Sequence, residues 1–134
     1  MKTSQQLVSE AKARIREISV DELHHILESP FSEMPPVLID VREPEEYRSG
    51  HILGAVNFPR GVLEMQLTNH PSVAGLSVDE ALMRMEDVPV YLICRSGARS
   101  ALAAASLQCM GLHQPVSVAG GMTAWNDKGW ANVD

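Results

Sequence analysis

Short, almost wholly apolar runs recur along this chain, and segments with helical character separate them. The runs cover residues 37–41, 55–58, 90–93 and 115–119. Strands that are apolar on both faces are typical of parallel sheets with helices packed on either side. The pattern therefore predicts an α/β fold, with a mostly parallel sheet covered by helices on both faces.

The helices between these runs are marked by their first residues. Residues 19–22 and 77–80 both read Ser-Val-Asp-Glu, the capping-box pattern in which serine and glutamate satisfy the first free N–H groups of a helix. We therefore expect helices to begin at these points and to continue to residues 27 and 85. Further helices are expected over residues 4–16, 44–47, 62–68, 98–110 and 122–128.

The composition limits the partners and the compartment. Eleven basic residues against 17 acidic ones give a formal net charge of -6, which disfavours nucleic acid or an anionic membrane as the main partner. Residues 1–19 have no continuous apolar core, and no run approaches the roughly 20 apolar residues of a membrane span. Two cysteines in such a chain fit a reducing compartment. We therefore expect a cytoplasmic protein.

Cys94 stands between the apolar run 90–93 and a short loop that begins a helix. Backbone N–H groups of such a loop, together with the positive end of the helix, stabilise an anion placed at their focus. Cysteines in such positions have pKa values of roughly 3.5–7.5, against an ordinary value of about 8.5. The alternative is a small apolar side chain packed at a strand end. The sequence favours Cys94 as a nucleophile.

The loop after Cys94 carries two arginines where stability alone favours acidic residues. The helix dipole favours Asp or Glu in a first turn by several tenths of a kcal/mol, so Arg95 and Arg99 oppose it. An anionic substrate explains the pair, and Gly97 lets the backbone approach that anion closely. The candidate substrate-binding residues are therefore Arg95, Ser96, Gly97, Ala98 and Arg99.

The second cysteine is expected to be structural. Cys109 shares one helical face with Leu102 and Ala105, which predicts burial against the sheet. At roughly 1.5 Å per helical residue it lies about 16 Å beyond the loop, too far to form a disulfide with Cys94. The cysteines and histidines have no metal-ligand spacing, so we expect no metal ion and no cofactor.

Three segments of the chain resemble the signatures of the rhodanese family of single-domain sulfurtransferases. They occur in the family's order across residues 37–125, which makes them more specific together than any one is alone. The segments are residues 38–47 with the glycine-containing turn 50–55, the cysteine loop 94–99, and Gly-Gly-Met-Thr-Ala-Trp at 120–125. The resemblance implies a five-stranded parallel sheet. It also divides the chain into an N-terminal helical extension, 1–17, and a rhodanese-like domain, 18–134.

The resemblance implies that the chain transfers sulfane sulfur. The thiolate of Cys94 would take the outer sulfur of thiosulfate or of a persulfide, and the resulting Cys94 persulfide would pass it to a thiol or cyanide. The acceptor could equally be a sulfur-relay protein. Backbone N–H groups of the loop would hold the terminal sulfur, while Arg95 and Arg99 would bind the donor's anionic group.

Three further residues are assigned supporting positions by the same resemblance. Asp40 would help to hold the architecture of the site, and Arg42 would pair with neighbouring acids. Arg60, directly after a predicted strand, would line the rim of the pocket. The assignments of Asp40 and Arg42 compete with an ordinary role as charges at a strand end.

Two other classes of protein remain open on the sequence. Cysteine-dependent phosphatases and arsenate reductases also place a thiolate under an arginine-bearing loop, with five residues between Cys and Arg to encircle a tetrahedral oxyanion. Here four residues, 95–98, separate Cys94 from Arg99, which suits a single sulfur atom better. A non-catalytic rhodanese-like regulatory module is the second alternative, and the presence of Cys94 weighs against it.

Overall fold

In the computed structural model, which describes residues 1–29 and 35–134, five strands form one sheet in which every ladder is parallel. This confirms the predicted α/β architecture. The order across the sheet is β1 (Arg16–Ile18), β5 (Pro115–Val118), β4 (Val90–Ile93), β2 (Val37–Asp40) and β3 (Val56–Asn57).

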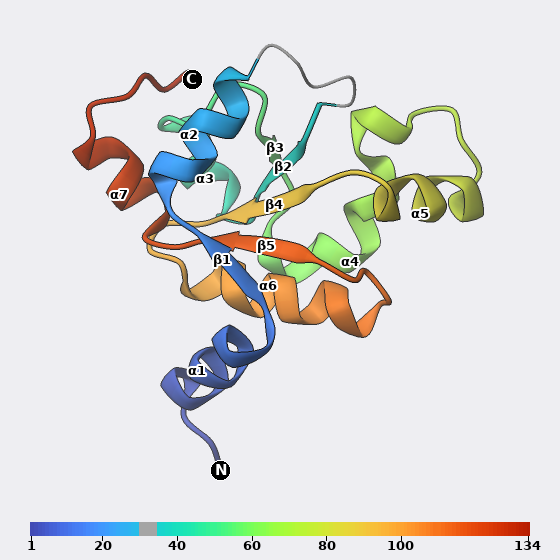
Figure 1. The fold of residues 1–134 in the computed structure, drawn as a ribbon, viewed down its shortest axis with the longest axis horizontal. Helices are drawn as coiled ribbons and strands as arrows, with labels where there is room; N and C mark the ends of the chain where they lie inside the picture. Colours follow the sequence, from blue (N-terminus) through green and yellow to red (C-terminus); the bar gives the residue numbers. More distant parts are fainter. Residues whose placement is uncertain (30–34) are drawn as a thin grey trace.

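Helices cover both faces of this sheet (Figure 1). On one face lie α2 (Val20–Glu28), α3 (Pro44–Arg48) and α7 (Gly121–Asp127). On the other lie α4 (Leu63–Gln66), α5 (Val78–Glu86) and α6 (Ala98–Cys109). The helix expected over 62–68 is divided into α4 and the flanking 3-10 turns Arg60–Val62 and Leu67–Asn69, and a third such turn covers Pro71–Val73.

The strand β4 shows why its sequence is apolar throughout. Val90 and Leu92 pack into the core beneath α4, α5 and α6, whereas Tyr91 and Ile93 pack into the core beneath α2 and α7. This alternation is what a strand buried on both faces requires. Cys94 continues it and turns toward the α6 side, where it is buried.

The N-terminal helix α1 (Ser4–Arg14) packs on the outer face of α6 (Figure 1). The contact is built from small side chains: Ala11 of α1 meets Ala101 and Ala105 of α6, with Val8 and Leu102 beside them. The inner face of α6 packs on the sheet. The helix that follows the cysteine loop is therefore held from two sides.

Two expectations near the N-terminus and in α6 were wrong. The helix expected to reach residue 16 ends at Arg14, and Arg16 instead begins the edge strand β1, which has no apolar run because two of its three residues are exposed. Cys109 is exposed rather than buried. Its stripe on α6 faces α1 instead of the sheet, and Cys109 stands at the last position of the helix. The division of the chain at residues 17 and 18 stays a prediction.

Candidate active site

The sulfur of Cys94 lies at the focus of a loop of backbone N–H groups. Gly97 donates its N–H to Sγ at 3.1 Å, and Ser100 donates its N–H at 3.3 Å. Gly97 precedes α6 with a φ of +103°, a conformation that favours glycine. A side chain there would also approach the backbone nitrogen of Gly120 to 3.3 Å. The loop can therefore stabilise negative charge on this sulfur.

Two buried hydroxyls extend this network away from the loop. Sγ of Cys94 donates to Oγ of Ser100 at 3.4 Å, and Oγ of Ser100 lies 2.8 Å from Oγ of Ser117 on β5. Both serines are fully buried. When the thiol is ionised, the hydroxyl of Ser100 can reverse and donate to the sulfur, because Ser117 can then donate to Ser100.

The turn before α7 packs directly against the cysteine loop. Met122 donates its N–H to the carbonyl of Cys94 at 2.8 Å, and Thr123 donates to the carbonyl of Arg95 at 2.9 Å. Gly121 has a φ of +53°, and a Cβ at this position would lie 2.4 Å from the carbonyl oxygen of Cys94. Gly121 is thus required by the close approach of two backbones, whereas a Cβ at Gly120, which also has a positive φ, would meet the side chain of Ala124.

Asp40 and Arg42 form a buried brace beside the loop. The carboxylate of Asp40 accepts hydrogen bonds from Nε of Arg42 at 3.0 Å and from Nη2 at 2.7 Å. Nη2 also donates to the carbonyl of Gly50 at 2.9 Å. Asp40 is opposite Ile93 in the β2–β4 ladder, so the brace stands one residue before Cys94. The brace fixes the end of β2 to the turn at Gly50, beside the strand that precedes Cys94.

The two loop arginines have different surroundings. Arg99 donates from Nη1 and Nη2 to the two carboxylate oxygens of Glu46, at 2.7 and 3.0 Å. This hydrogen bond, followed by the charge of Arg99 among the smaller causes, lowers the pKa of Glu46 to about 2. The same bond raises the pKa of Arg99, and the nearby charge of Cys94 raises it further. Arg95 is exposed and has no ion pair among the described residues.

Arg95 lines a polar pocket of about 410 Å³ at the carboxyl edge of the sheet, which we call the carboxyl-edge pocket. Charged and polar side chains from the loop, α3 and α7 surround it, so a small polar molecule could bind beside the cysteine loop. The lining residues are Arg42, Glu46, Ser49, Arg95, Met122, Thr123, Asn126 and Asp127.

Arg60 is not among the residues that line the carboxyl-edge pocket. Its backbone N–H donates to the carbonyl of Val41 at 2.9 Å, and its Nη1 lies 3.1 Å from a carboxylate oxygen of Glu64. Glu64 also accepts a hydrogen bond from Ser106 of α6, which lowers the pKa of this carboxyl, as the charge of Arg60 does to a smaller extent. Arg60 thus helps to connect the segment after β3 to α6.

The sequence did not predict three residues of this arrangement, Ser117, Ser100 and Glu46. Ser117 had a signal, because it is the single polar residue inside the apolar run 115–119. Ser100 and Glu46 do not interrupt an apolar run, so no such signal marks them. The contact of each with the loop depends on the tertiary fold, which brings α3, α6 and β5 to one edge of the sheet.

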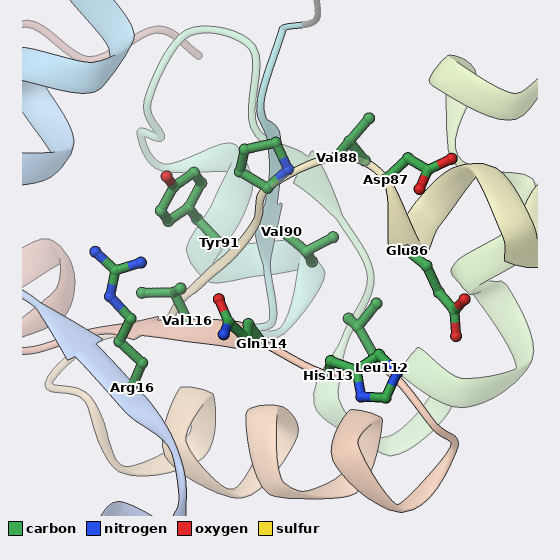
Figure 2. A pocket seen from close by; sticks show the side chains of 11 residues that line it. Arg16, Glu86, Asp87, Val88, Val90, Tyr91, Leu112, His113, Gln114 and Val116 are labelled. Carbon is green, nitrogen blue, oxygen red and sulfur yellow. The ribbon is translucent and has the colours of Figure 1, made fainter.

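A second polar pocket lies at the opposite edge of the sheet, where β4 and β5 begin. This amino-edge pocket has a volume of about 330 Å³. Figure 2 shows Glu86 and Asp87 at its rim, at the end of α5, with His113 and Gln114 before β5 and Arg16 from β1. Neither this lining nor that of the carboxyl-edge pocket includes a cysteine, but only the carboxyl-edge pocket is lined by a residue of the cysteine loop, Arg95. No group of three or more potential metal ligands occurs among the described residues.

The fold and the three signatures define a class of protein, and comparison with known families identifies it. The model of the Rhodanese-like domain family matches residues 19–128. The chain therefore belongs to the rhodanese family, as the sequence resemblance predicted. None of the helices in the described part of the chain is long and apolar enough to cross a membrane.

Two similar proteins are named as sulfur transferases. The thiosulfate sulfurtransferase GlpE of Pseudomonas entomophila is 35% identical over 89 residues, which are 66% of this chain and 69% of GlpE. The polysulfide-sulfur transferase homodimer of Wolinella succinogenes superposes with a TM-score of 0.70 at 29% identity, covering 97% of this chain and 86% of that one.

A further structural neighbour is described as a possible tyrosine phosphatase. This protein of unknown function from Rhodopseudomonas palustris has a TM-score of 0.80 and 29% identity, and the match covers 99% of this chain and 96% of that one. Two curated relatives from Bacillus subtilis are longer, and the chain spans 61% and 56% of their lengths.

Proposed function

We propose that this protein transfers sulfane sulfur from thiosulfate or a persulfide to a thiol or cyanide acceptor, through a persulfide on Cys94. The observation that carries the proposal is the convergence of the Gly97 and Ser100 N–H groups on Sγ of Cys94. Such fixed donors stabilise the anionic Sγ before the attack, and again when the acceptor releases it as a thiolate.

In the first step, Sγ of the Cys94 thiolate attacks the outer sulfur of the donor. A new S–S bond forms, and the bond between that sulfur and the rest of the donor breaks. The leaving group departs with the electron pair, as sulfite from thiosulfate or as a thiolate from an organic persulfide. The sulfur moves without a further oxidant or reductant.

In the second step, an acceptor thiolate or cyanide attacks the outer sulfur of the Cys94 persulfide and releases the Cys94 thiolate. The buried hydroxyls of Ser100 and Ser117 then stabilise the returning charge. The acceptor can be a small thiol or a sulfur-relay protein, and a relative from Bacillus subtilis is named a putative sulfur carrier protein. We place the protein in the cytoplasm, where the reducing conditions keep free cysteines available.

The phosphatase description of the Rhodopseudomonas palustris neighbour fits this loop less well. A phosphoryl group needs several donors around a tetrahedral anion, including the loop arginine. Here both carboxylate oxygens of Glu46 already bind Arg99, and the N–H groups of Gly97 and Ser100 focus on one atom. We therefore favour sulfur transfer over phosphate hydrolysis.

Intact-mass spectrometry tests the proposal. Because Cys109 is exposed and could itself collect sulfur, the reference protein carries Cys109→Ser. After treatment with thiosulfate or glutathione persulfide it should gain one sulfur atom, and cyanide should remove that atom as thiocyanate. Addition of Cys94→Ser should abolish the gain. An unchanged mass in the reference protein, or an equal gain without Cys94, would contradict the proposal. Hydrolysis of an aryl phosphate without sulfur loading would point to the phosphatase alternative.

A further inference from the structure

The charges around the carboxyl-edge pocket are nearly balanced, although the cysteine loop contains two arginines. Glu46 neutralises Arg99 through a two-point ion pair, and Asp40 neutralises Arg42 in the buried brace. Only Arg95 and Asp127 then remain as charged lining residues with no ion pair among the described contacts. One uncompensated cation therefore shares the pocket with one uncompensated anion.

Glu46 is held in this position by its own helix. Its Oε1 accepts the N–H of Glu43 at 2.9 Å in the capping box of α3, while both of its oxygens bind Arg99. The carboxylate is thus fixed from both directions, between α3 and the first turn of α6. Movement of Arg99 to a substrate would require the loss of two charge-assisted hydrogen bonds, which are among the stronger polar contacts in proteins.

From this balance we infer that the site selects an organic persulfide bearing both a carboxylate and an ammonium group over dianionic thiosulfate, with Glu46 and Asp127 as specificity-determining residues. The inference rests on the proposed sulfur transfer at Cys94. Arg95 would bind the carboxylate of the donor, and Asp127 would bind its ammonium group. Cysteine persulfide is the smallest donor with these groups.

Charge also disfavours thiosulfate in the transfer step itself. Its attack by the Cys94 thiolate brings a dianion to an anion and leaves a sulfite dianion beside the new persulfide. Cysteine persulfide is a monoanion overall when its amino, carboxyl and persulfide groups are all ionised. Its leaving group is the cysteine thiolate. With Arg99 already neutralised by Glu46, the loop has less positive charge to offset the additional charge of thiosulfate.

Steady-state kinetics with the two donors, cysteine persulfide and thiosulfate, tests the inference. The wild type should have a kcat/KM at least about tenfold higher for the persulfide. In Glu46→Gln, which keeps an oxygen for the Glu43 N–H, Arg99 is uncompensated, and kcat/KM for thiosulfate should rise about five- to tenfold. The persulfide value should change by less than about twofold, because this donor has less net charge to be attracted.

Three further variants separate selection by charge from a structural effect. Glu46→Asp keeps the charge and should retain the preference of the wild type, whereas Glu45→Gln alters an exposed neighbour on α3 and should change nothing. Asp127→Asn should raise KM for cysteine persulfide about threefold without raising KM for thiosulfate, as expected for a solvent-accessible ion pair.

The alkylation rate of Cys94 by iodoacetamide at pH 7 gives a readout that needs no sulfur donor. Removal of the Glu46 charge should speed it, because the uncompensated Arg99 stabilises the thiolate. Equal alkylation and an unchanged donor ratio in Glu46→Gln would overturn the inference, as would a wild type that prefers thiosulfate, and both leave sulfur transfer intact. Failure of both donors to load Cys94 would instead contradict the proposed function.

Discussion

The two edges of the sheet both carry a polar pocket, yet they differ in what those pockets can do. The amino-edge pocket, about 330 Å³, and the carboxyl-edge pocket, about 410 Å³, are similar in size, and both have charged side chains in their walls. At the carboxyl edge, a loop beside the pocket also directs two backbone N–H groups at one sulfur atom. Pocket volume and charge therefore do not distinguish the two edges, whereas the N–H donors fixed around the sulfur of Cys94 do.

The largest difference between the edges should be in stability. Arg42→Ala leaves the fully buried carboxylate of Asp40 without its partner, which should lower the free energy of unfolding by about 3–5 kcal/mol. Arg16→Ala at the amino edge removes an exposed side chain and should change it by less than about 0.5 kcal/mol. Urea denaturation of both variants measures this difference. If Arg42→Ala loses as little free energy of unfolding as Arg16→Ala, the brace is dispensable for stability.

Two glycines sharpen the comparison at the level of the backbone. Gly111, near the amino edge, and Gly121, at the carboxyl edge, both have positive φ, but a Cβ meets no atom within 4 Å at Gly111 and lies 2.4 Å from Cys94 O at Gly121. Gly121→Ala should therefore cost about 1–3 kcal/mol more than Gly111→Ala, and sulfur loading should fall with it. Thermal melts measure the stability of both variants, and mass spectrometry measures their sulfur loading. Similar stability losses in the two variants would mean that the turn before α7 relaxes freely.

Arg95 provides a kinetic test with a smaller effect. Arg95→Gln removes the unpaired cation of the carboxyl-edge pocket and should raise KM for an anionic donor about fivefold, with little change in kcat. Arg16→Gln removes a cation from the amino-edge pocket and should leave both constants unchanged. Donor titrations of the two variants give the comparison. An equal rise of KM in both variants would indicate that the overall charge of the protein, rather than Arg95, attracts the donor.

The smallest expected effect is the pH dependence of the Glu46–Arg99 pair. The pKa of Glu46 falls from an ordinary 4.5 to about 2 in the folded protein. The pair therefore stabilises the fold fully above pH 4.5, and this contribution is lost as the pH falls toward 2. For a partly exposed pair it should amount to about 1 kcal/mol.

The measurement is the difference in free energy of unfolding between wild type and Glu46→Gln, at pH 7 and again near pH 3. The difference should shrink at the lower pH. A difference that is the same at both would show that ionisation of Glu46 contributes nothing to stability.

The sequence predicted the parts of the fold that have local signals. Apolar runs predicted β2, β4 and β5, and the serine-glutamate caps predicted α2 and α5. The short edge strand β1 had no such signal, because pairing with β5 rather than its own pattern places it in the sheet. The burial of Cys109 was wrongly predicted for a related reason, since periodicity shows which residues share a face but not what covers it.

The candidate site also contains features with a local sequence signal and features that depend on tertiary packing. The position of Cys94 after a strand and before a helix was evident from the sequence, and the structure surrounds its sulfur with N–H groups. The unequal surroundings of Arg95 and Arg99 were not evident, because Glu46 lies 53 residues from Arg99 along the chain. Contacts of such long range depend on the packing of α3 beside the loop, and no local pattern encodes them.

The place of β4 in the sheet has a consequence for hydrogen exchange. It is the middle strand of the order β1-β5-β4-β2-β3, and all four of its residues are buried. Amides of such a strand exchange with solvent through global rather than local opening, whereas the two-residue edge strand β3 is expected to exchange sooner. Cys94 directly follows β4, so its thiol is anchored to the part of the molecule that we expect to exchange most slowly. Its position should then persist for as long as the whole fold does.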